Sequence, residues 1–309
     1  MVRNKKIIIL WVITCTLIGL AGCSSLRPDP AGTTPGQPVL VTPVEPIQRP
    51  PRLGLALGGG AARGFAHVGV IQVLEQNGIR PDIMVGTSAG SLVAALYASG
   101  KTAADLERTA LSMEEALLTD WTLPFNGRGM LRGDALTRYV RHAIDGRLIE
   151  QMTIPLGILA TDLSNGQGML FRRGDAALAV RASSAVPGVF TPVTIAGREY
   201  VDGGLVAPVP VSHVRALGAD IVLAVDISSD PQANDASGLL GLLLQTTAIM
   251  GQTINRHELR TADIIVRPAL SAVSSTDFSA RQHAIAAGRA AMQAALPRLK
   301  AQLTQWRPD

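Results

Sequence analysis

A serine between two glycines is the residue of this sequence best suited to covalent chemistry. Ser88 is flanked by Gly86 and Gly90 in a GxSxG pattern. Apolar residues predict a short buried strand at 83–85 before it, and a helix is expected at 88–98 after it. Glycines on both sides let the chain turn sharply, so that the hydroxyl is presented at the sheet edge beside a helix N-terminus. The pattern indicates a nucleophile for acyl transfer.

A glycine-rich turn forms the second candidate motif, at residues 58–64 (GGGAARG), between an expected strand at 53–57 and an expected helix at 64–76. A dinucleotide fingerprint would need glycine where Arg63 stands, and a phosphate-binding P-loop would need lysine where Phe65 stands. Exposed backbone N–H groups and a cation suit an oxyanion. The alternative is that these glycines serve only tight packing against the sheet.

An aspartate followed by two glycines is the third motif: Asp202, Gly203 and Gly204 follow an expected strand at 199–201. Alone it is an ordinary turn. The three motifs in this order resemble the patatin-like phospholipase family, which uses a serine and aspartate dyad. The likeness extends to residues 182–190 (ASSAVPGVF) and 205–210 (LVAPVP), and covers about residues 52–290.

The resemblance implies a mechanism in which Ser88 attacks an ester carbonyl and Asp202 accepts its proton. The loop of Gly58, Gly59 and Gly60 forms the oxyanion hole, with the N–H groups of Gly59 and Gly60 as donors. Arg63 orients this loop or a phosphate head group, and no cofactor or metal is needed. A carboxylate is a weak base, so we expect concerted transfer or a pKa raised by burial.

The implied function is a lipid acyl hydrolase, a phospholipase A or lysophospholipase type of esterase. One alternative is a Ser-His-Asp carboxylesterase or thioesterase on soluble esters, for which His257 and His283 follow the acid in the required order. Another is a catalytically weak lipid-binding module. Lipid contact is considered at residues 121–125 and 239–244, where ordinary core is an equal alternative.

The N-terminus has the pattern of a secretory leader, with basic residues followed by an apolar run at 7–20. The sequence LAGC at 20–23 resembles a bacterial lipobox, which implies a signal peptide at 1–22 and lipidation of Cys23. An uncleaved anchor or an ordinary secreted protein is the alternative. Residues 23–51 are rich in proline and predict a tether. We expect lipid anchoring in the bacterial envelope, with the periplasmic side of the outer membrane favoured by Ser24.

Composition bounds the remaining possibilities. The chain of 309 residues is 47% hydrophobic and 17% charged, which is enough for a large core. Its net charge of +4 includes three cations of the leader, so the rest carries +1 and no nucleic-acid partner is indicated. Strand and helix signals alternate from residue 52 onward without a second linker. They predict one α/β domain at 52–309, a three-layer sandwich with a mostly parallel central sheet.

Overall fold

The computed structural model describes residues 49–113, 120, 128–231 and 237–308. The expected leader, Cys23 and most of the tether lie outside these residues, as does the segment 121–125 considered for lipid contact. Gln48–Asp309 form one compact unit. Within the described residues, no helix is long and apolar enough to cross a bilayer.

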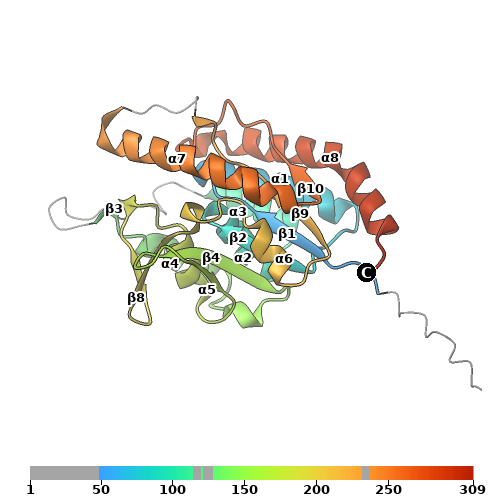
Figure 1. The fold of residues 1–309 in the computed structure, drawn as a ribbon, viewed down its shortest axis with the longest axis horizontal. Coiled ribbons are helices and arrows are strands. Elements are labelled where there is room, and N and C mark those ends of the chain that lie inside the picture. The colour runs from blue at the N-terminus through green and yellow to red at the C-terminus, as the bar shows by residue number, and fades with distance from the viewer. Residues whose placement is uncertain (1–48, 114–119, 121–127, 232–236, 309) are drawn as a thin grey trace, which may run out of the picture. The chain divides into compact units, whose positions relative to one another are not determined.

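A mostly parallel sheet forms the middle of this unit (Figure 1). Five parallel strands lie in the order β10 (Ile264–Val266), β9 (Ile221–Val225), β1 (Leu53–Leu57), β2 (Ile83–Thr87) and β4 (Leu156–Asp162). Antiparallel strands complete it at β4: β5 (Gly168–Phe171), β8 (Arg198–Asp202) and β7 (Val193–Ile195). The sequence predicts two strand pairs, 154–160 with 169–171 around Asn165-Gly166 and 193–195 with 199–201 around Ala196-Gly197. Both pairs are confirmed.

Helices cover both faces of the sheet, because the central strands are apolar on both sides. Leu55 of β1 faces a core shared with α1 (Ala66–Gln76), α2 (Ala89–Ala98), α3 (Ala103–Ser112) and α8 (Arg281–Gln305). Its neighbour Ala56 faces a second core with α6 (Val211–Ala216) and the end of α7 (Gly238–Glu258). The predicted three-layer α/β arrangement is confirmed. Smaller elements are α4 (Asp134–Ala143), α5 (Ala176–Ser183), and the paired strands β3 (Gly129–Leu131) and β6 (Gly188–Phe190).

The last helix differs from the sequence prediction. The sequence predicts a helix at 279–302 that is interrupted at Pro297, but α8 continues through this residue from Arg281 to Gln305. Proline removes one backbone hydrogen bond and favours a kink, yet Met292 and Leu299 on either side of it are fully buried. Their packing holds the two halves in one helix, so tertiary contacts override the local preference.

Candidate active site

The register of β4 brings Ser88 and Asp202 together, although 113 residues separate them in the chain. β2 ends with Thr87 opposite Leu159 of β4. The antiparallel strand β8 ends with Asp202 opposite Ala160, the next residue of β4. β2 and β8 therefore run in opposite directions along the same edge of β4 and end next to each other. The nucleophile follows one strand end and the carboxylate lies at the other.

Ser88 has the strained backbone of a sharp strand-to-helix turn, with φ 53° and ψ −124°. Both flanking glycines are required because backbone carbonyl oxygens of other residues lie where a side chain would begin. A Cβ on Gly86 would lie 2.4 Å from the carbonyl oxygen of Gly90, and one on Gly90 would lie 2.1 Å from that of Leu57. Strain of this kind persists only where the surrounding structure holds it. The elbow predicted from the GxSxG pattern is thus present in the backbone.

Ser183 holds this turn in place. Its hydroxyl accepts a hydrogen bond from the Ser88 N–H at 2.8 Å and donates to the carbonyl of Leu159 at 2.5 Å. It is fully buried near the end of α5. The sequence showed a family likeness at 182–190 but no role for these residues. The structure gives Ser183 the role of tying the elbow to β4.

The carboxylate of Asp202 is buried, with 6% of the residue exposed. Its Oδ1 accepts a hydrogen bond of 2.7 Å from the N–H of Gly204, while Oδ2 is buried and has no hydrogen-bond partner in the described part of the chain. Burial raises the pKa of Asp202 to about 6, and the nearby Ser88 hydroxyl limits the rise although it forms no regular hydrogen bond. A pKa raised by burial is one of the two conditions under which this carboxylate could accept a proton from a hydroxyl.

The two glycines after Asp202 have separate roles. A Cβ on Gly203 would lie 2.2 Å from the carbonyl oxygen of Leu159, so the chain passes too close to β4 for any side chain. Gly204 supplies the N–H group that fixes the Asp202 carboxylate. The pattern DGG is therefore a requirement of this corner of the sheet as well as a turn signal.

The glycine loop differs in one respect from the implied arrangement. The N–H of Gly59 donates to the carbonyl of Pro208 at 2.9 Å, and that of Gly58 to Val225 at 3.1 Å. Neither is free to bind an oxyanion in this structure. The N–H groups of Gly60 and Ala61 have no hydrogen-bond acceptor among the described residues. The free donors thus lie one residue further along than expected, at Gly60 and Ala61.

A buried histidine braces the same loop. His67 of α1 is fully buried, and its Nε2 lies 2.8 Å from the carbonyl oxygen of Gly58. Burial lowers the pKa of His67 to about 4, so the ring is neutral at pH 7 and Nε2 donates the bond. No motif in the sequence indicated this contact. His67 is a positioning residue for the loop.

Arg63 is nearly buried, with 9% of the residue exposed. Burial lowers its pKa, while the charges of Asp226 and Asp230 oppose that change. Its Nε has no hydrogen-bond partner within the described ranges. Arg63 therefore brings a nearly buried cation to the glycine-rich turn of residues 58–64, and no contact between it and Ser88 or Asp202 is found among the described residues.

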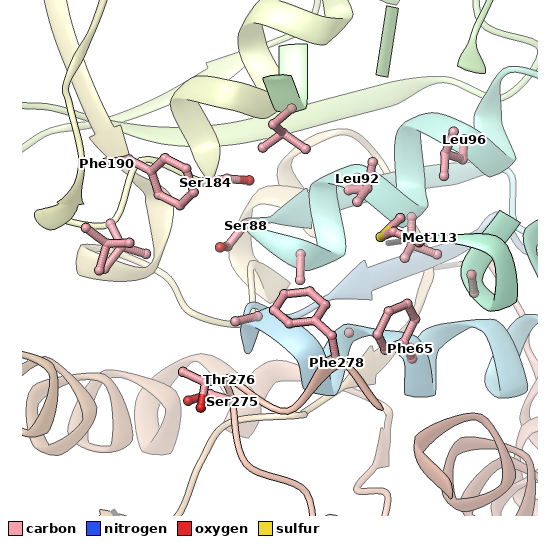
Figure 2. Close-up of a pocket in the computed structure, with 18 of the residues that line it drawn as sticks. Phe65, Ser88, Leu92, Leu96, Met113, Ser184, Phe190, Ser275, Thr276 and Phe278 are labelled. Carbon is pink, nitrogen blue, oxygen red and sulfur yellow. The ribbon is translucent and has the colours of Figure 1, made fainter. Parts of the chain in front are cut away.

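An apolar cavity of about 310 Å³ opens beside Ser88. Figure 2 shows Ser88 between Phe190 on one side and Leu92 and Met113 on the other. The apolar residues that line the cavity include Phe65, Leu92, Leu96, Met113, Phe190 and Phe278. Of the segment 239–244, Leu244 lines this cavity and is 36% exposed, while Leu239, Leu242 and Leu243 do not line it and are exposed by 48–76%.

The histidines considered for a triad lie elsewhere. His257 is exposed near the end of α7 and His283 is exposed near the start of α8. In the described part of the chain, no histidine lines the cavity beside Ser88. Nor does that part contain a cluster of acidic, histidine or cysteine side chains able to hold a metal ion.

Comparison with known proteins agrees with this geometry. Residues 55–215 match the profile of the family described as patatin-like phospholipase. An uncharacterized NTE family protein of Mycobacterium tuberculosis is 33% identical over 208 residues, which cover 65% of this chain and 58% of that protein. Lysophospholipase NTE1 of Pyricularia oryzae is 33% identical over 181 residues, covering 57% of this chain and 12% of its own length. The fold is similar to the crystal structure of VipD from Legionella pneumophila, with TM-score 0.51 and 14% identity over 81% of this chain and 67% of that one.

The matched segment spans more than half of the chain and contains all three motifs, so the chain belongs to the patatin-like phospholipase family. The resemblance inferred from the motifs is confirmed. The aligned part of the chain accounts for little more than half the length of its mycobacterial relative.

Proposed function

We propose that this protein is a lipid acyl hydrolase that uses Ser88 and Asp202 as a catalytic dyad. The observation that supports the proposal is the meeting of β2 and β8 on one edge of β4. Ser88 follows one strand end, and Asp202, whose Oδ2 has no hydrogen-bond partner among the described residues, lies at the other. An apolar cavity opens at the same serine. This is the arrangement needed to cleave an ester whose acyl part is a hydrocarbon chain.

The proposed reaction proceeds through an acyl-enzyme. The Ser88 Oγ attacks the ester carbonyl carbon as its proton passes to Oδ2 of Asp202. The N–H groups of Gly60 and Ala61 stabilise the oxyanion. Collapse breaks the bond to the alcohol, which leaves with the proton from Asp202. Water then attacks the acyl-enzyme, Asp202 takes a proton from that water, and the proton returns to Ser88 as the fatty acid departs.

The cavity supports a lipid substrate rather than a short soluble ester. Its lining is apolar along α2 and at Phe65 and Phe278. If a methylene group needs about the 30 Å³ of a liquid water, the cavity of about 310 Å³ takes on the order of ten of them. The relative named lysophospholipase supports a phospholipase A or lysophospholipase type of activity.

The test is fatty-acid release from phosphatidylcholine vesicles by the parent and by Ser88→Ala, Asp202→Asn, His257→Ala and His283→Ala. We expect loss of activity in the first two variants only, with fold verified by circular dichroism. Loss in a histidine variant would support a triad. Release from short soluble esters alone would support the carboxylesterase alternative, and binding of lipid without any hydrolysis would support the binding module.

We propose further that the protein is lipidated at Cys23 and held at the periplasmic face of the outer membrane. The support comes from the leader pattern, the sequence LAGC and Ser24 after the cysteine. Metabolic labelling with a palmitate analogue and membrane fractionation test this. Labelling that persists in Cys23→Ser would contradict the proposal.

A further inference from the structure

One face of α7, drawn in orange in Figure 1, carries apolar side chains into solvent. Six of the ten large apolar residues that are exposed in the described part of the chain belong to this helix. Five of them are separated by three, four or seven residues, which places them on one side of a helix. We call these five the outer stripe: Leu239, Leu242, Leu243, Ile249 and Met250, exposed by 48–76%.

The polar groups of α7 suit an apolar medium. The sequence has no charged residue or histidine from Gly238 to Asn255. The hydroxyls of Thr246 and Thr253 point along the same side as the outer stripe by helical spacing, and each donates to the carbonyl four residues earlier. The hydroxyls thus bring no unsatisfied donor, which would be costly to move from water into hydrocarbon.

The same helix continues into the candidate active site. Leu244 lines the cavity that contains Ser88. Leu240 and Leu243 lie 3.3 Å and 3.9 Å from the position that a Cβ on Gly188 would occupy, at the start of β6. The helix that carries the outer stripe therefore also contributes to the cavity beside Ser88.

The size of the outer stripe argues against a second copy of the chain. Eleven residue steps separate Leu239 from Met250, a length of about 17 Å at 1.5 Å per residue. A strip of that length and about one helix wide falls far below the roughly 800 Å² per partner of a stable protein interface. We infer that the outer stripe of α7 docks the protein onto a lipid bilayer, with the helix lying in the plane of the interface.

This inference names the membrane partner of the site and rests on the proposed function. Because the outer stripe lacks charge, binding through it needs no anionic lipid and resists about 1 M NaCl, where the Debye length is about 3 Å. The test uses residues 24–309, which follow the expected leader and Cys23, contain no cysteine and include the compact unit of residues 48–309, with Ser88→Ala. An environment-sensitive dye is attached at Leu242→Cys or, as a matched exposed control, at Leu163→Cys.

On adding phosphatidylcholine vesicles, the dye at position 242 should shift its emission to shorter wavelength and the dye at 163 should not. Equal responses at both positions would overturn the inference. So would a shift that depends on protein concentration without lipid, which indicates a second copy. The dye needs no turnover, so a protein that hydrolyses nothing but shows the shift at 242 refutes only the proposed function.

A second measurement uses residues 24–309 with Ser88 retained and with Leu239→Gln, Leu242→Gln and Met250→Gln together, since glutamine keeps helix propensity. We expect hydrolysis of vesicle phospholipid to fall at least about tenfold, with short soluble esters cleaved within about twofold of the parent. The paired control Leu148→Gln and Leu163→Gln should change neither. Full activity of the triple variant on vesicles would overturn the inference.

Discussion

Replacing Asp202 by asparagine should stabilise the protein above pH 6 while it abolishes activity. Burial raises the pKa of this carboxyl from 3.8 to about 6, so ionisation is less favourable in the folded chain than in the unfolded one. Between these two values the folded state binds more protons, and stability falls as pH rises. Asparagine has similar size, keeps an oxygen for the N–H of Gly204 and carries no charge to desolvate.

The magnitude follows from the pKa. Each pH unit of difference corresponds to about 1.36 kcal/mol, so a rise from 3.8 to about 6 opposes folding by about 3 kcal/mol at pH 7. The unfavourable contribution is absent below pH 3.8 and constant above pH 6. For a protein of this size, about 3 kcal/mol is equivalent to roughly 6–12 °C in Tm. Activity of the parent should rise with pH through about 6, because Asp202 must be ionised to accept a proton.

The assay is urea unfolding of the parent and Asp202→Asn from pH 4 to pH 8, with esterase activity measured in parallel. Subtracting the two unfolding free energies at each pH removes the contribution of His67, which is the same in both proteins. The pKa of His67, lowered to about 4, makes stability fall as pH decreases. Asp162→Asn is the control of opposite sign. Hydrogen bonds from Ser164 and the charge of Arg198 lower the pKa of Asp162. At pH values where the parent's Asp162 is ionised, Asp162→Asn should therefore be less stable than the parent.

Two results would refute this reasoning. A difference between Asp202→Asn and the parent that stays constant from pH 4 to pH 8 would show that Asp202 has an ordinary pKa. A variant less stable than the parent at pH 8 would show that the carboxylate stabilises the fold, and that its buried Oδ2 has a partner when charged.

Three further changes test the packing around the site. Ser183→Ala should reduce kcat at least about tenfold with little change in KM and lower the unfolding free energy by about 1–3 kcal/mol, because it leaves the buried N–H of Ser88 without an acceptor; steady-state kinetics and urea unfolding measure both, and unchanged kcat would contradict it. Leu92→Trp should narrow the cavity, so that hydrolysis of long-chain esters falls while that of acetyl esters persists in a chain-length series; equal losses for all lengths would count against the assigned acyl site. Gly288→Ala should destabilise the protein by about 3 kcal/mol or more in urea unfolding, since its Cβ would lie 1.9 Å from the carbonyl oxygen of Ala66, and a neutral result would contradict the close packing of α1 and α8.

Most of the fold could be predicted because its signals are local. Apolar runs bounded by glycines marked β1 and β2, and the turn at 165–166 marked the pairing of β4 with β5. The continuity of α8 through Pro297 could not be predicted, since it depends on burial of Met292 and Leu299 against distant elements. The exposure of the outer stripe is likewise invisible in a sequence that reads as apolar.

The sequence predicted those parts of the candidate site in which two backbone segments pass so close together that only glycine fits. Glycines at 86, 90 and 203 are required because a Cβ would overlap the backbone, and such glycines form motifs. Ser183 and His67 act through single hydrogen bonds between segments far apart in the chain, which no spacing rule reports. The engagement of Gly59 by Pro208 is of the same kind, and it moved the free donors to Gly60 and Ala61.

β2 and β8 end next to each other on β4, so the spacing of Ser88 and Asp202 does not depend on how many residues lie between them in the chain. Leu159 and Ala160 are adjacent, so one peptide unit of a hydrogen-bonded strand sets the spacing of the two reacting groups. Turns at Gly166 and Gly174, where a Cβ would meet nothing within 4 Å, could lengthen during evolution without moving either group. A single residue inserted into β4 itself would shift one group and not the other. The strand that contributes no reacting atom is therefore the one that tolerates least change.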